Sequence, residues 1–145
     1  MSQTDQLLRR KAIRETLAQR AGGSPNAAAV AEAALDTWRQ MAVRLEPVIG
    51  ARGVDVLFGR SLYLTSKNFP WLASAAVHGN SAASLASLRA CFETRDTGAA
   101  AEAGFALLVA FTELLATLIG EPLTERLLGA VWVSTQPNSE PQTTQ

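Results

Sequence analysis

The spacing of the apolar residues is the feature that most constrains how this chain can fold. Between residues 30 and 49, apolar side chains recur at steps of three and four, as they do along one face of an α-helix. Alanine, the residue with the highest helix propensity, is also the most frequent, at 26 of 145 positions. No run of four or more β-branched residues shows the two-residue alternation of a half-buried strand. The sequence therefore predicts an all-α protein.

Glycines, prolines and capping residues divide the chain into about six expected helices. The length of 145 residues suits one compact domain, which we expect over residues 1–133 as a single helical bundle. Ser24 is predicted to cap the second helix, with Pro25 in its first turn, and Pro47 is predicted to end or kink that helix near Glu46. The polar residues 134–145 are expected to form a disordered tail. We expect the helices over about 4–20, 25–46, 54–67, 81–94, 97–120 and 122–133.

A weak internal repeat appears when the chain is shifted by 70 residues. Ile49-Gly50 then falls on Ile119-Gly120, and Leu45 falls on Leu115. Each unit would contain a long helix, a glycine stop and a second helix, so the repeat predicts two related helical hairpins packed around a pseudo-twofold axis. The alternative is that amphipathic helices with glycine stops resemble one another by chance.

Composition excludes several classes of function. Lys plus Arg and Asp plus Glu both number 13, so no overall field attracts nucleic acid or an anionic membrane. A single Cys and a single His leave no ligand set for a zinc site or an iron–sulfur cluster. The polar, basic residues 1–14 do not resemble a secretory signal, and the apolar run 103–119 is interrupted by Glu113. We therefore expect a cytoplasmic protein with no membrane insertion, no metal and no cofactor.

The sequence contains no recognised catalytic motif, so we expect a protein that is not an enzyme. His78 could accept a phosphoryl group, but the following Gly79 and Asn80 are typical of a loop, and local packing or capping is the favoured interpretation. Cys91 lies beside Leu88 and Phe92 on the apolar side of its expected helix, which indicates core packing rather than redox sensing.

The irregular segment 68–80 is the best candidate for a ligand pocket. Its aromatic and apolar residues either fill a gap in the core, which we favour, or cover a small-molecule site. In the second case, the preceding helix would supply polar groups to an apolar pocket. The candidate ligand-binding residues are Arg60, Tyr63, Lys67, Phe69, Trp71 and His78.

Charge is uneven along the chain. Residues 1–20 carry five basic and two acidic side chains, whereas residues 90–130 carry two basic and six acidic ones. The basic cluster Arg9, Arg10, Lys11 and Arg14 lacks interleaved aromatic residues, so we expect no nucleic-acid partner. A solvated helix face, or an arm lying on an acidic partner surface, is the favoured interpretation.

The low charge content predicts an interface. Only 18% of the residues are charged, and the segment 99–119 contains just Glu102 and Glu113. Its apolar arc exceeds what a surface helix requires, so either the helix is central in the bundle or another chain covers it. We expect a helical protein-interaction module that forms a homodimer and binds a further, unidentified protein in a regulatory, adaptor or sensor-partner role. A small-molecule-binding protein or enzyme with a pocket under the segment 68–80 is the alternative. The candidate interface residues are Phe105, Leu107, Phe111, Leu114 and Leu118.

Overall fold

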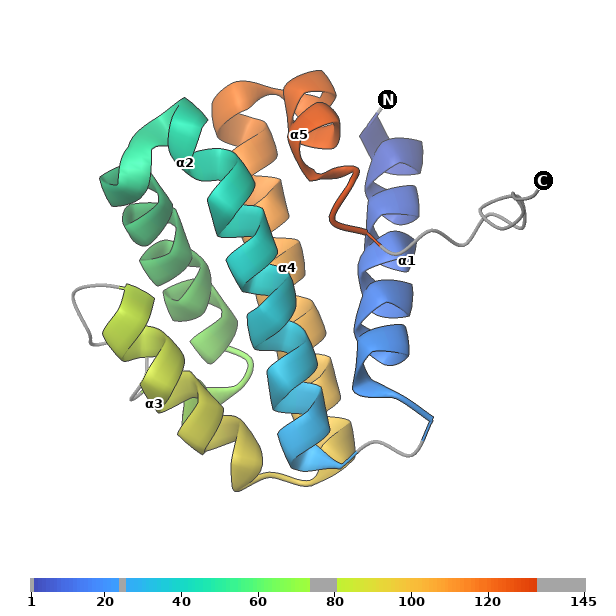
Figure 1. Cartoon of the computed structure of the whole chain (residues 1–145), viewed down its shortest axis with the longest axis vertical. Coiled ribbons are helices and arrows are strands. Elements are labelled where there is room, and N and C mark those ends of the chain that lie inside the picture. The colour runs from blue at the N-terminus through green and yellow to red at the C-terminus, as the bar shows by residue number, and fades with distance from the viewer. Residues whose placement is uncertain (1, 24–25, 74–80, 133–145) are drawn as a thin grey trace.

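Nearly all of the structure is helical. The computed structural model describes residues 2–23, 26–73 and 81–132 (Figure 1). Ser24, Pro25, His78 and the expected tail 134–145 lie outside these residues. Within them no strand occurs, and the all-α prediction is confirmed. The elements are α1 (Ser2–Ala21), α2 (Ala27–Ser66), the short 3₁₀-helix η1 (Pro70–Leu72), α3 (Ser81–Glu93), α4 (Thr97–Ile119) and α5 (Glu121–Leu128).

The described residues form five α-helices rather than about six, because α2 takes in two of the expected helices. The chain changes direction within α2 at Gly50, whose φ of 82° and ψ of 158° are not helical (Figure 1). The predicted break at Pro47 is therefore wrong by three residues. Pro47 removes one hydrogen bond to the carbonyl of Val43, but the side chain of Val43 is 72% exposed. Water can reach this side of the helix, so the last turn forms and the helix stops at the glycine.

The two long helices begin with the same capping chemistry. The side chain of Asn26 accepts a hydrogen bond from the backbone N–H of Ala29 at 2.8 Å, so Asn26, and not Ser24, is the N-cap of α2. The side chain of Asp96 accepts one from the N–H of Ala99 at 3.4 Å. Each cap satisfies a backbone donor that the first turn of a helix leaves without a partner.

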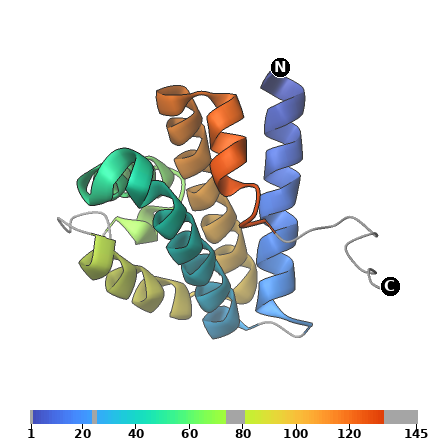
Figure 2. The same ribbon diagram turned by 45° about the horizontal axis from the view of Figure 1, so that its top comes forward.

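The N-caps and the stop glycines of α2 and α4 are related by the same spacing of 70 residues. Asn26 and Asp96 are 70 residues apart, and so are Gly50 and Gly120, whose φ angles are 82° and 94°. The first half of α2 and the whole of α4 run side by side in the same direction (Figures 1 and 2). Both members of several residue pairs in this spacing are buried: Val30 and Ala100, Ala33 and Ala103, Ala34 and Gly104, Thr37 and Leu107, Trp38 and Leu108, Met41 and Phe111, and Leu45 and Leu115.

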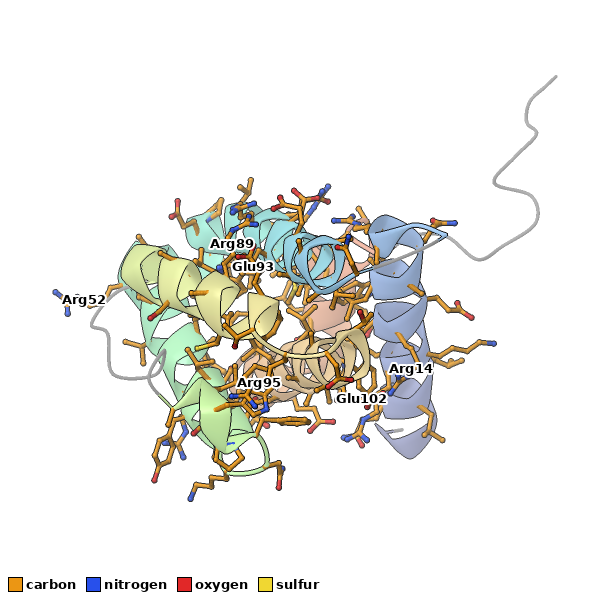
Figure 3. The ribbon with its side chains drawn as sticks, turned by 90° about the horizontal axis from the view of Figure 1, so that it is seen from below. Arg14, Arg52, Arg89, Glu93, Arg95 and Glu102 are labelled. Atoms are coloured by element: carbon orange, nitrogen blue, oxygen red, sulfur yellow. The ribbon has the colours of Figure 1, made fainter. Side chains whose placement is uncertain are left out.

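The core lies between α2 and α4. The ring of Trp38 in α2 lies 4.4 Å from that of Phe58, across the bend of the same helix, and 4.7 Å edge-on from that of Phe111 in α4. These contacts join both halves of α2 to α4 through one aromatic cluster. The remaining helices cover the sides of this pair, with α1 on one side and α3 on the other (Figure 3).

An exposed ion-pair network connects α3 to α2. Arg89 of α3 donates a hydrogen bond to Glu32 of α2 and lies 3.7 Å from Glu93 of its own helix (both labelled in Figure 3). Arg39 adds a second positive charge 3.5 Å from Glu32. The hydrogen bond from Arg89 outweighs the effect of burial and lowers the pKa of Glu32 below its usual value.

Replacing either stop glycine is expected to destabilise the fold. With φ of 82° and 94° and ψ near 155°, Gly50 and Gly120 occupy a backbone region that is essentially restricted to glycine. Gly50→Ala and Gly120→Ala should each lower the free energy of unfolding by about 1–3 kcal/mol in urea denaturation.

Gly59, inside the second half of α2, is the matched control. A Cβ at either Gly50 or Gly59 would meet no atom within 4 Å, so the two substitutions differ only in backbone conformation. Gly59→Ala should raise the free energy of unfolding by about 0.5–1 kcal/mol through helix propensity. Equal effects at both positions would contradict this explanation.

Candidate functional site

The residues predicted to line a pocket near the segment 68–80 are divided between the surface and the core. Arg60, Tyr63 and Lys67 lie on the exposed side of α2, and the ammonium group of Lys67 lies 4.9 Å from the ring centroid of Tyr63. His78 is outside the described residues. The helix before the segment 68–80 therefore offers these polar groups to solvent rather than to the core.

The aromatic residues of this segment pack against the edge of the core. The ring of Trp71 lies 6.2 Å from that of Phe69 and 5.8 Å from that of Phe92 in α3, and the guanidinium of Arg95 lies 5.1 Å from its centroid. Leu72, at the end of η1, is completely buried. Phe69, Trp71 and Leu72 thus fill the gap between α2 and α3, as the favoured interpretation of the sequence expected.

The predicted interface residues on α4 differ in how deeply they are buried. Leu107 and Phe111 are 3% and 0% exposed because they point towards α2 and pack in the chain's own core. Their assignment to an intermolecular interface is corrected, since no partner can reach them in the folded chain. Phe105 and Leu114 are half-buried, and Leu118 is 62% exposed.

A strip of α4 is left partly uncovered by the rest of the chain. We call it the α4 outer face and define it as Ala106, Ala110, Leu114, Thr117 and Leu118, of which the first three are half-buried and the last two exposed. From Ala106 to Leu118 the strip is about 18 Å long at the helical rise per residue. It carries no charged side chain of its own, and small residues occupy its first two turns.

The basic residues of α1 have intramolecular partners. Arg10 donates to Glu113 at 2.6 Å and Arg14 donates to Glu102 at 3.1 Å, and both carboxylates belong to α4. Figure 3 shows Arg14 pointing from α1 towards Glu102 at the lower end of α4. The acidic surface that the sequence led us to expect on a partner therefore belongs, for these arginines, to the chain itself.

Arg9 is the most deeply buried of these cations. Its side chain is 2% exposed and lies 2.5 Å from Glu121 and 3.1 Å from Glu125, both in α5. Burial opposes the charged form, but the hydrogen bonds and charges of the two glutamates outweigh it and raise the pKa of Arg9 above its ordinary value. This ion-pair cluster connects α5 to α1. A hollow of about 170 Å³ lies beside the cluster and is bordered by Leu8 and Trp132.

A larger hollow lies between α1, the first half of α2 and α4. It has a volume of about 230 Å³, is partly open to solvent, and sits where α1 ends and α4 begins (Figure 1). Its wall is almost entirely apolar, and Arg14 stands at its mouth. No motif in the sequence indicated it, because the lining comes from three helices. The lining residues include Leu17, Ala18, Val30, Ala34, Ala101 and Phe105.

Three further features complete the description. Among the described residues, no group of three or more His, Cys, Asp or Glu side chains could hold a metal ion. Cys91 is half-buried at the edge of the core. By length and composition alone α4 could cross a bilayer, and half of its most apolar stretch is buried in the bundle.

Comparisons of the chain with family models, with curated proteins and with solved structures give no match. The features of the molecule that bear on its function are therefore the α4 outer face and the two hollows.

Proposed function

We propose that this protein is a non-enzymatic, cytoplasmic interaction module that acts as a homodimer through the α4 outer face. The observation that carries the proposal is the exposure of this strip: Leu118 is 62% exposed at the end of an otherwise half-buried apolar stripe. Contact with a second molecule would remove this surface from water, at a gain of about 25 cal/mol per Å² of apolar area.

The charges beside the strip favour a second copy of the same chain as the occupant. Glu102 and Glu113 border the strip, and Arg14 and Arg10 already neutralise them. In a twofold-symmetric interface each surface meets its own copy, so unpaired charges on it would repel. With those carboxylates paired, two copies can meet without this repulsion.

The shape of the strip also suits a helix–helix contact. The side chains of Ala106 and Ala110 are small, so the backbone of a second α4 can approach closely, while Leu114 and Leu118 provide the larger apolar contacts. In this proposal the buried apolar residues of α4 form the core, and its less buried ones form the dimer contact.

Leu118→Glu is expected to dissociate the dimer. Each dimer would then bury two carboxylates without partners, and at about 1.4 kcal/mol per factor of ten the dissociation constant should rise at least about 100-fold. Sedimentation equilibrium over a range of protein concentrations measures this change directly.

Val43→Glu is the matched control. Val43 is 72% exposed, and it lies on the side of α2 that faces away from α4. The same charge introduced there should leave the dissociation constant unchanged. A wild-type protein that stays monomeric at tens of micromolar, or equal effects of both substitutions, would overturn the proposal.

A further inference from the structure

The hollow between α1, α2 and α4 exists because the facing residues are small. Ala18 on α1, Ala34 on α2, and Ala101 and Gly104 on α4 all lie at its wall. Large side chains at such positions would fill the space between three helices, and small ones leave it empty unless the helices close up.

Ion pairs join α1 to the two other helices at the sides of this space. Arg14 pairs with Glu102 of α4 at 3.1 Å, and Arg20 pairs with Asp36 of α2 at 3.2 Å. The hollow is therefore a feature of the packing of α1 against α2 and α4.

The size and the lining of the hollow define the class of ligand. A cavity of about 150 Å³ is known to hold benzene, so 230 Å³ has room for about nine carbon atoms. The wall provides aliphatic groups and one aromatic ring, that of Phe105. A compact apolar group fits this space, whereas a polar one would lose its hydrogen bonds to water.

Arg14 provides the polar contact at the mouth. Its guanidinium lies over the ring of Phe105, 3.9 Å from the centroid, which fixes its position. Its one hydrogen bond to Glu102 uses one of five N–H donors, so others can bind an incoming anion. Lys11, exposed on the preceding turn of α1, adds a second positive charge.

We propose that this hollow binds a compact hydrophobic carboxylate, with the hydrocarbon part between the three helices and the carboxylate on Arg14. The site does not involve the α4 outer face. Arg14 is the one residue that the two proposals share, because it also pairs with Glu102 beside that face.

Calorimetric titration with octanoate and with 1-octanol tests the site. Both molecules have eight carbon atoms, and they differ in the head group, which is a charged carboxylate in octanoate and a neutral hydroxyl in octanol. Wild-type protein should bind octanoate at least about fivefold more tightly than octanol. Arg14→Gln should weaken octanoate binding about fivefold to tenfold, as expected for the loss of one charge-assisted hydrogen bond, and leave octanol binding within twofold.

Ala101→Leu tests whether the hydrocarbon part lies in the hollow, since three added carbon atoms occupy much of its volume. We expect both ligands to bind at least about tenfold more weakly. Ala51→Leu is the matched control, because Ala51 is exposed near Gly50 at the opposite end of the bundle, and its affinities should equal those of the wild type. If Ala101→Leu fails to fold, Ala18→Leu fills the same hollow from α1.

Each contrary result bears on one part of the proposal. No binding of either molecule to the wild-type protein would overturn it entirely. Unchanged affinity in the cavity-filling variants would show that the ligand lies elsewhere. Equal affinity for octanoate and octanol, with no effect of Arg14→Gln, would overturn the assignment of a carboxylate.

Discussion

Phe111→Ala is expected to lower the free energy of unfolding by about 3–5 kcal/mol. The ring of Phe111 is completely buried and lies 4.7 Å edge-on from Trp38, so its removal leaves a void in the centre of the aromatic cluster. For a protein of this length the melting temperature should fall by about 10 °C. Urea denaturation followed by tryptophan fluorescence measures the free energy of unfolding, and thermal denaturation followed by circular dichroism measures the melting temperature.

The same substitution also separates core from interface. A residue that acts through a dimer loses its effect when the protein is diluted below the dissociation constant, whereas a core residue keeps it at every concentration. Val43→Ala, at an exposed position away from α4, should change stability by less than about 1 kcal/mol. A cost at Phe111 below about 1 kcal/mol, or one that disappears on dilution, would contradict its place in the core.

Arg9→Met is expected to lower the free energy of unfolding by about 2–3 kcal/mol. Methionine retains an unbranched apolar chain but leaves Glu121 and Glu125 facing each other without a cation. Breaking a buried ion pair costs about 3–5 kcal/mol, and we expect less here because the side chains of the two glutamates are 25% and 45% exposed. Thermal and urea denaturation at neutral pH test this value.

Arg10→Met is the matched control for Arg9→Met. Arg10 is 47% exposed and its partner Glu113 is 35% exposed, so loss of this pair should cost less than about 1 kcal/mol. The triple variant Arg9→Met, Glu121→Gln and Glu125→Gln should recover part of the stability, because no buried charge then lacks a partner. Equal costs at Arg9 and Arg10, or no recovery in the triple variant, would show that the charges of this cluster are not responsible.

The ends of the helices show how well a single residue in the sequence predicts where a helix stops. Gly120 was expected to stop α4, and its positive φ confirms that stop. Pro47 gave an equally plain local signal, yet the helix continues to Gly50. A proline inside a helix removes one hydrogen bond, and whether this ends the helix depends on how the surrounding structure satisfies the freed carbonyl.

The candidate interface on α4 shows that the spacing of apolar residues does not predict which of them the chain itself buries. Leu107 and Leu114 both belong to the broad apolar arc of α4, and their spacing is compatible with the same face. Only the packing of α2 and α1 against α4 places Leu107 in the core and leaves Leu114 half-buried. The arc was too wide to be a surface stripe, and the sequence offered no way to tell which part of it a neighbouring helix covers.

The all-α class, the stop at Gly120 and the 70-residue spacing followed from the sequence alone, because helix propensity and apolar spacing can be read from short stretches of sequence. The partners of Arg9, Arg10 and Arg14 and the hollow between three helices depended on the tertiary structure. Arg14 and Glu102 are 88 residues apart in the chain, and Ala18, Ala34 and Ala101 meet only when α1 docks on the pair α2 and α4. Contacts between such distant residues arise from how whole helices pack, which no short stretch of sequence encodes.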